Sequence, residues 1–324
     1  MQQLGQELKR KVPEHITAEE ELSHARRIFS EANTIVSTML LDCRMGKQVE
    51  LEKITPVVAA ITSSIFRNPD ALISLLRIKQ ADKYTFQHSV AVSTLLISFC
   101  RTMAVERKVI EQAGIGGLLH DVGKMSIPNA ILNKPGKLTE TEFETMKLHV
   151  DYGCRILRDT PNLSVTSYAI AAEHHERYDG SGYPKGLKNE EISLFGQMAS
   201  IIDVYDALTS NRVYHTGIEP TEALKKILEW SEYHFNAQLV HQFIRAIGIY
   251  PVGTLVRLES GYLAVVVEQH HENLLRPKVK IIFNSNAHCY VPPKNFDLSK
   301  PGCNDRIVSF ESPQHWHLNP LHFL

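Results

Sequence analysis

Apolar residues recur at helical spacing through the first three quarters of the chain. Behind a Thr17–Glu20 pair that reads as a capping box, apolar side chains follow one another every three or four residues as far as Met39. The segment 84–103 is apolar on nearly every face, which is typical of a helix at the centre of a bundle. The pattern predicts helices from residue 17 to about residue 247. The N-terminal apolar seam belongs either to a signalling or dimerising helix, which would make a homodimer, or to a helix that packs on the chain's own core.

The pattern changes after residue 253. Three short runs rich in Val, Ile and Leu come next, separated by Ser260-Gly261 and by a polar stretch at 271–273. Such runs predict a small antiparallel β meander. The end of the chain shows no period and is expected to be irregular. The predicted fold class is mainly α, with an N-terminal helical segment, a helical domain, a small β-rich extension and an irregular tail at 1–80, 81–248, 249–300 and 301–324.

Composition restricts the classes of function. The 324 residues include 35 lysines and arginines against 36 aspartates and glutamates, so no overall charge attracts the chain to DNA or to an anionic membrane. The longest apolar run, at 91–100, is about half as long as a membrane-spanning helix, and the N-terminus lacks the apolar core of a secretory signal. Five scattered cysteines argue against a disulfide framework and against a thiolate zinc site. We therefore expect a cytoplasmic protein without a membrane span or a DNA partner.

Ionisable residues stand at helical positions that should be apolar. A single histidine on an apolar face is more often a hydrogen-bonded core residue than a metal ligand. Several such residues that point into one bundle are different, because unpaired buried polar groups are costly and a shared cation would satisfy them together. The residues are His88, His120, Asp121, His149, His174, His175 and Asp203.

These residue types predict the kind of metal centre. Imidazole and carboxylate ligands without thiolate suit iron, manganese, cobalt, nickel or zinc. The ligands exceed what one ion takes while leaving room for a substrate, so we expect two ions with Asp121 as the bridging ligand. The adjacent His174 and His175 would diverge by about 100° on a regular helix. At a fraying helix end beside a second ion, both histidines can be ligands. We therefore expect the two histidines to occur side by side because there are two ions.

Two motifs point to a family. With "HDVGK" at 120–124 and "HHERYDGSGYP" at 174–184, the chain resembles the HD-GYP domain proteins, the class of phosphodiesterases that hydrolyse cyclic di-GMP. The resemblance covers roughly residues 82–250, and the β-rich segment is similar to the one that many relatives carry after this domain. It implies an HD-type helical bundle as the catalytic domain at 81–248. It also implies that the buried histidines and aspartates named above are the metal ligands.

The chain departs from the family pattern at two places. Some members hold a third metal through a Glu one helical turn before the first ligand histidine, and this chain has Tyr84 there, so a binuclear site of Fe or Mn ions is expected. The family commonly has Arg-Pro-Tyr followed by Lys or Arg after the helix with the ligand aspartate. This chain has Arg212, Val213, Tyr214 and His215. Weaker phosphate binding or an altered substrate preference would result.

The resemblance also implies an activity. Cyclic di-GMP would be linearised to pGpG, with GMP as a further product left open, by a hydroxide that bridges the two ions. Asp121 and Lys124 are the expected catalytic residues, and Lys124 and Arg212 would offset the charge that builds in the transition state. The expected substrate contacts are Lys124, Arg212, His215, Gly182 and Tyr183.

Other functions fit parts of the same sequence. A catalytically weak module could keep the metal centre or the fold and dock through the loop at 177–184 to a partner such as a diguanylate cyclase. The complete set of ligand residues disfavours this alternative, and Val213 and His215 keep it open. The same loop and the full ligand set disfavour a phosphohydrolase of mononucleotides. An oxygen-activating di-iron enzyme is a more distant alternative. Asp206, three residues after Asp203, either orients a ligand histidine, or caps its helix or faces solvent.

Overall fold

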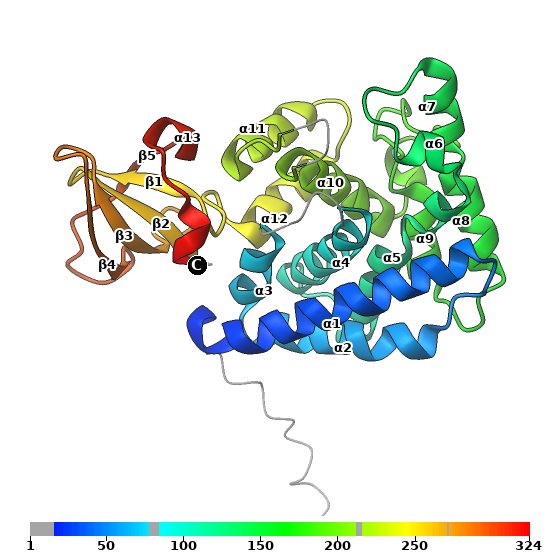
Figure 1. The fold of residues 1–324 in the computed structure, drawn as a ribbon, viewed down its shortest axis with the longest axis horizontal. Coiled ribbons are helices and arrows are strands. Elements are labelled where there is room, and N and C mark those ends of the chain that lie inside the picture. Colours follow the sequence, from blue (N-terminus) through cyan, green and yellow to red (C-terminus); the bar gives the residue numbers. More distant parts are fainter. Residues whose placement is uncertain (1–15, 78–83, 212–215, 271) are drawn as a thin grey trace, which may run out of the picture.

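The computed structural model describes residues 16–77, 84–211, 216–270 and 272–324. A helical body and a small β-sheet lie at opposite ends of the view in Figure 1. The predicted helices between residue 17 and about residue 247 are confirmed within the described ranges. They are α1 (Ala18–Arg44), α2 (Leu51–Arg67), α3 (Pro69–Leu76), α4 (Tyr84–Thr102), α5 (Arg107–Leu119), α6 (Asn129–Leu132), α7 (Glu140–Lys147), α8 (His149–Arg158), α9 (Val165–Glu173), α10 (Leu194–Thr209), α11 (Pro220–Trp230) and α12 (Ala237–Ile247), with the short 3-10 helices η2 (Val122–Ser126) and η3 (Asn189–Glu191).

The first helix begins and packs as its sequence predicts. The Thr17 N–H donates to Glu20 Oε2 over 2.7 Å and the Glu20 N–H donates to Thr17 Oγ1, which completes the predicted capping box. Ala25, Ala32 and Val36 are fully buried along one face of α1 and join the same hydrophobic core as α4. Of the two predicted alternatives, packing on the chain's own core is therefore the one that the structure shows.

The helix α4 lies at the centre of the body with other helices around it (Figure 1). Every residue from Gln87 to Cys100 is buried, which confirms the expectation for this segment. Its buried hydroxyls have backbone partners: Ser93 Oγ donates to Gly114 O and Thr94 Oγ1 donates to Val90 O, both over 2.8 Å. Buried polar groups on this helix are thus satisfied, as they must be in a dry interior. The histidine on α4 needs partners for the same reason.

The C-terminal strands form one antiparallel sheet in the order β4-β3-β2-β1-β5. The first four follow one another as the predicted meander, which is confirmed. Its strands run along the left of the view in Figure 1. They are β1 (Leu255–Leu258), β2 (Tyr262–Glu268), β3 (Lys278–Asn284) and β4 (Cys289–Asp297).

The prediction of an irregular tail at 301–324 is wrong. Residues Ile307–Phe310 form β5, which pairs antiparallel with β1, and two short helices come after it, α13 (Pro313–Trp316) and η4 (Pro320–Phe323). A strand of four residues carries too little alternation to be recognised locally. Its hydrogen bonds depend on a partner strand far earlier in the chain, so a search for local periods misses it.

No gap in packing marks the predicted boundary at residue 80. Apolar residues of α1, α2 and α3 belong to the same core as those of α4 to α12. The domain boundaries therefore stay predictions. None of the helices in the described ranges is both long and apolar enough to cross a bilayer.

A buried carboxylate joins the helical body to the sheet. Asp70 on α3 accepts a hydrogen bond of 2.7 Å from the backbone N–H of Gln269, just after β2. Burial is the largest effect on this carboxyl and raises its pKa to about 7. The negative charge of Glu268 acts in the same direction, while the Gln269 N–H, Arg101 and Lys278 act against it. The folded chain thus holds a proton on Asp70 that an unfolded chain releases near its ordinary pKa of 3.8.

This difference predicts how stability depends on pH. Because the folded pKa is the higher one, the contribution of Asp70 to the free energy of unfolding falls as pH rises from about 4 to about 7. Asp70→Asn keeps an oxygen that accepts from Gln269 and removes the charge. We expect the variant to be more stable than the wild type at pH 8, by up to about 4 kcal/mol, and equally stable near pH 4. Denaturant unfolding of both proteins at several pH values measures the difference, and equal stability at pH 8 would contradict the raised pKa.

Candidate metal centre

Five segments of the helical body bring the predicted ligands together. His88 lies on α4, and His120 and Asp121 connect α5 to η2. The remaining ligands come from the start of α8, from the end of α9 and from α10. All seven are buried except the partly buried His175: His88, His120, Asp121, His149, His174, His175 and Asp203.

Hydrogen bonds to the backbone fix how three of the histidines point. The Nδ1 atoms of His120, His149 and His174 lie 2.8, 2.7 and 3.0 Å from the carbonyl oxygens of Gly117, Met146 and Ala171. A carbonyl can only accept, so each Nδ1 carries the proton and each Nε2 presents a lone pair in the neutral ring. Each of the three rings is thereby held by the helical turn that precedes it, with its Nε2 atom directed into the centre.

Two pairs of Nε2 atoms face each other across the centre. His88 Nε2 lies 3.2 Å from His120 Nε2, and His149 Nε2 lies 3.4 Å from His174 Nε2. Burial lowers the pKa of His149 to about 4 and that of His174 to about 3, so both rings are neutral near pH 7. The lone pairs of His149 and His174 that face each other at this distance repel each other. A cation among them would turn the repulsion into coordination.

Asp121 lies between the two histidine pairs. Its Oδ2 is 3.3 Å from His120 Nε2 and 3.5 Å from His88 Nε2, whereas its Oδ1 is 3.4 Å from His149 Nε2 and 3.8 Å from His174 Nε2. Burial alone would raise the pKa of this carboxyl, but the positive charge of Lys124 and the interactions with His120 lower it well below its ordinary value. The Oδ1 atom is fully buried and has no hydrogen-bond partner within the described part of the chain. An ionised, unpaired oxygen in the interior is costly unless it binds a cation.

The donor atoms fit a divalent transition metal. They form two groups whose ligand atoms lie within 4.8 Å of one another, and the two groups share Asp121. Imidazole and carboxylate donors without thiolate suit this class of ion. One group consists of His88, His120 and Asp121, and the other of Asp121, His149, His174 and His175.

The structure corrects one detail of the sequence prediction. His174 and His175 were expected to occur as a pair because there are two ions, yet both contribute to the same group of donors. The physical reason is that α9 ends at Glu173, so His175 is no longer held at the helical angle. Its ring lies 4.1 Å from the His174 ring, measured between centroids.

Asp203 closes the side that faces solvent. Its Oδ1 lies 3.0 Å from His88 Nε2 and its Oδ2 lies 3.7 Å from His175 Nδ1. The side chains of Asp203 and His175 are 12% and 14% exposed, whereas those of His88 and Asp121 are 2% and 1% exposed. A substrate would therefore reach the centre from the side of Asp203 and His175.

Asp206 holds the histidine on the central helix. Its Oδ2 lies 2.8 Å from His88 Nδ1, and both residues are buried. Of the predicted alternatives for Asp206, orientation of a ligand histidine is the one that this contact favours. A carboxylate at Nδ1 keeps the proton there and leaves Nε2 as the donor atom toward a metal.

Loss of this contact should weaken metal binding without removing a ligand. We expect Asp206→Ala to lower the affinity for Mn(II) by about 10- to 100-fold, because His88 loses the partner that fixes its proton and its ring. Titration against a fluorescent chelator measures the affinity. Asp206→Asn, which keeps one oxygen near Nδ1, should lie between the alanine variant and the wild type. Equal affinities for all three proteins would contradict a role of Asp206 in metal binding.

The loop after the histidine pair packs on His175. The Tyr183 ring stacks on the His175 ring at 4.6 Å, and the Tyr183 N–H donates to the His175 carbonyl over 3.2 Å. A Cβ on Gly182 would lie 2.3 Å from the backbone nitrogen of Arg177, so only glycine fits there. The loop thus positions a predicted ligand. Substrate contacts by Gly182 and Tyr183 remain a proposal.

A buried glutamate anchors the loop, and sequence reasoning missed it. Glu176 is 1% exposed, and its two carboxylate oxygens accept from the backbone N–H groups of Lys185 and Leu187 over 2.8 and 3.1 Å. The available signal was an acidic residue directly after two predicted ligands, at the start of a loop rich in glycine.

The structure describes only one of the basic residues that were predicted to bind the substrate. Lys124 Nζ lies 2.5 Å from Asp121 Oδ2, at the edge of the metal centre. Arg212 and His215 lie outside the described residues.

Comparison with known proteins settles the family. Residues 68–239 match the family described as HD domain. The chain belongs to the HD domain family. In this HD domain protein the sheet also matches a family, at residues 255–302, described as a KOW domain associated with HD domain.

Individual relatives place the HD domain protein more closely. It is 44% identical over 309 residues to cyclic di-GMP phosphodiesterase PA4108 of Pseudomonas aeruginosa, across 95% of this chain and 74% of that protein. It is 42% identical over 123 residues to 3'3'-cGAMP-specific phosphodiesterase 2 of Vibrio cholerae, across 38% of this chain and 24% of that protein. Bd1817, a solved HDG"Y"P protein from Bdellovibrio bacteriovorus, has the same fold, with a TM-score of 0.59 and 21% identity over 72% of this chain and 74% of that one. The HD-GYP resemblance of the sequence is thereby confirmed.

Proposed function

We propose that this protein is a metal-dependent phosphodiesterase that hydrolyses cyclic di-GMP. The observation that carries the proposal is the buried carboxylate of Asp121 between two histidine pairs, with one oxygen unpaired among the described residues. This arrangement occurs in a chain that is 44% identical, over 95% of its length, to a cyclic di-GMP phosphodiesterase. The buried centre supplies a site for metal chemistry, and the relative supplies the substrate class.

We propose that the centre holds two divalent ions, Fe or Mn, with Asp121 as the shared ligand. The two donor groups that share this residue support the number. When bound, such ions act as Lewis acids and lower the pKa of water, which is the chemistry that phosphodiester hydrolysis needs. The proposed ligands are His88, His120, Asp121, His149, His174, His175 and Asp203.

The remaining residues would bind and orient the substrate. Lys124 carries an ammonium group at the edge of the centre, where it can offset the charge of a phosphate. The partly exposed His175 and Asp203 leave an approach for the substrate, and Tyr183 stabilises the ring of His175 on that side. We keep Arg212 and His215 as proposed phosphate contacts, with the weaker binding that the sequence predicts. The product, pGpG or GMP, depends on how well the linear dinucleotide rebinds.

Several further properties stay predictions. They are the catalytic domain boundaries at 81–248, a homodimer, a cytoplasmic location, and a diguanylate cyclase partner that binds the loop at 177–184. The docking alternative would not need Asp121 Oδ1 to be ionised and unpaired in the interior. That atom favours the enzyme over the docking module.

Substrate competition tests the proposed substrate class. Initial rates of the Mn(II)-loaded protein on cyclic di-GMP, on 3'3'-cGAMP and on a mononucleotide give kcat/KM for each. We expect cyclic di-GMP to have the highest value. A higher value for 3'3'-cGAMP would change the substrate within the same chemistry, and a higher value for the mononucleotide would overturn the phosphodiesterase assignment.

A further inference from the structure

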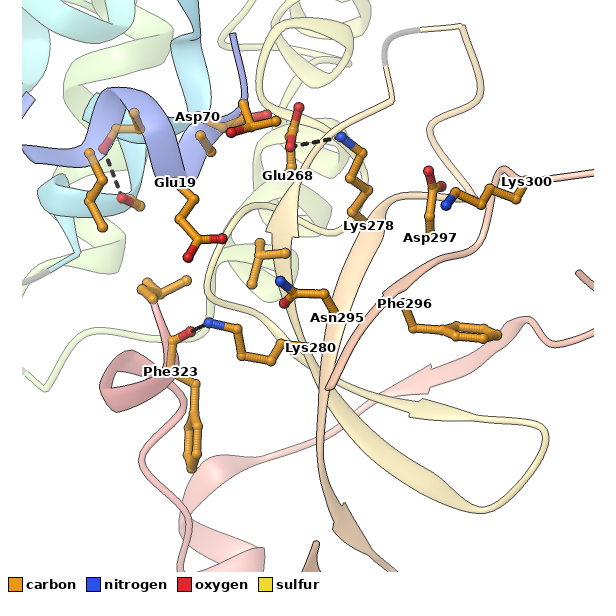
Figure 2. A pocket seen from close by; sticks show the side chains of 17 residues that line it. Glu19, Asp70, Glu268, Lys278, Lys280, Asn295, Phe296, Asp297, Lys300 and Phe323 are labelled. Atoms are coloured by element: carbon orange, nitrogen blue, oxygen red, sulfur yellow. Dashed lines mark hydrogen bonds and ion pairs between the residues drawn. The ribbon is translucent and has the colours of Figure 1, made fainter. Parts of the chain in front are cut away.

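A cavity lies where the helical body meets the sheet. It has a volume of about 460 Å³ and is lined by α1, α3, β2, β3, β4 and the C-terminal residues (Figure 2). None of the proposed metal ligands lines it. A volume of this size is within the range of pockets that hold small molecules.

Charged side chains line both walls of this junction cavity. The helical wall contributes the carboxylates of Glu19 and Asp70, and the sheet wall contributes Lys280 and the amide of Asn295. Figure 2 shows Glu19 reaching from the helical side toward the space into which Lys280 and Asn295 extend from the strands. The opposite charges do not meet, because no ion pair joins Glu19 or Asp70 to a lysine in the described part of the chain.

The other acidic residues of the cavity already have partners. Glu268 Oε2 is 3.0 Å from Lys278 Nζ. Burial would raise the pKa of Asp297, but hydrogen bonds from the N–H and the hydroxyl of Ser299 and the charges of Lys278 and Lys300 lower it, so these lysines offset its charge. Lys280 Nζ donates to the carbonyl of Phe323, over 2.8 Å, which leaves its charge without a counter-ion among the described residues. After these pairings, Glu19 leaves negative charge on the helical wall, Asp70 is only partly ionised near pH 7, and Lys280 leaves positive charge on the sheet wall.

Asp70 points to an ammonium group as the missing partner. Its side chain is 97% buried, since the residue is 3% exposed, and it accepts one backbone hydrogen bond from Gln269. A carboxylate in this position is costly without a cation, and its raised pKa reflects that cost. An ammonium ion beside Glu19 and Asp70 would favour the ionised form of Asp70 and provide its countercharge. The apolar lining, which includes Leu22, Phe296 and Phe323, would accept a hydrocarbon side chain.

We propose that the junction cavity binds a free amino acid with an apolar side chain, its ammonium group at Glu19 and Asp70 and its carboxylate at Lys280. Both charges of such a ligand are needed, since Glu19 and Lys280 carry opposite charges that no ion pair within the described residues neutralises. The proposed binding site does not depend on the proposed hydrolysis, because binding of the amino acid can be measured without cyclic di-GMP and without metal.

Binding of L-amino acids to the full-length protein tests this proposal. Isothermal titration would be run with leucine, isoleucine, valine, methionine, phenylalanine and tryptophan, one at a time. We expect at least one of them to bind with a Kd below about 10 mM. Its decarboxylated amine and its deaminated acid should each bind at least tenfold more weakly. Absence of binding by all six, or equal binding of the amine or the acid, would overturn the proposal.

Matched substitutions locate the site. Glu19→Gln and Lys280→Met should each weaken binding of that amino acid at least tenfold. Glu31→Gln on α1 and Lys294→Met on β4 change the same charges at exposed positions outside the cavity lining and should bind as the wild type does. Because Glu19 is exposed and Lys280 is half-buried, both variants are expected to fold, and thermal melting checks this. Unchanged affinity in both would place the bound amino acid elsewhere and overturn the assignment.

Discussion

Replacement of Asp121 by alanine is expected to lower kcat on cyclic di-GMP by about a thousandfold or more, and to lower the content of bound metal. The reason is the place of this carboxylate between two histidine pairs. Its two oxygens lie 3.3 to 3.8 Å from the Nε2 atoms of His88, His120, His149 and His174. Without it the centre loses the one anion that both donor groups share.

The measurement pairs steady-state kinetics with metal analysis of the purified protein. Asp151→Ala is the control, because Asp151 is an exposed carboxylate on α8, two residues from His149, and it lines no part of the centre. The control should keep wild-type metal content and rate. An Asp121→Ala protein that retains full metal content and activity would contradict the central position of this residue.

Gly123→Ala is expected to destabilise the protein by about 3 kcal/mol or more and to reduce metal binding at the same time. A Cβ at residue 123 would lie 1.9 Å from the carbonyl oxygen of His149 and 2.3 Å from the nitrogen of Gly153. Both are backbone atoms, so η2 and α8 would have to separate. Such a shift would move Asp121 and His149 apart, because these residues stand on the two elements.

Gly153, which lies on the other side of this contact, provides the control. A Cβ on Gly153 would lie 3.4 Å from the nitrogen of Gly123, which is ordinary van der Waals contact. Gly153 lies within α8, where alanine is favoured over glycine by about 1 kcal/mol. Gly153→Ala should therefore fold with equal or higher stability and with full metal content, as measured by thermal melting and metal analysis. Similar losses in the two variants would contradict the asymmetry of this contact.

The parts of the fold that sequence could predict are those with a local cause. The helix α1 follows from its capping box and its apolar spacing, and α4 follows from a long run without a polar face. The seven candidate ligands stood out because ionisable groups interrupt apolar stripes, and the structure brings them together. Local pattern was enough for these features because the spacing of apolar residues within each segment indicates which of its positions are buried.

The parts that sequence could not predict depend on distant segments. β5 exists because β1 offers it an edge, and Asp206 reaches His88 across two helices that are far apart in the chain. His175 turns toward His174 only because α9 stops one residue earlier than the histidine pair. The junction cavity requires α1 and the sheet to meet, which no local pattern reveals.

Hydrolysis of cyclic di-GMP under anaerobic conditions is the most direct test of the proposed enzyme. The protein would be stripped with a chelator, reloaded with Fe(II) or Mn(II), and assayed with chromatographic separation of pGpG and GMP. We predict no turnover in the stripped protein and restored turnover with either ion. Absence of turnover in protein shown to hold the metal, or turnover that persists after the metal is removed, would contradict a metal-dependent cyclic di-GMP phosphodiesterase.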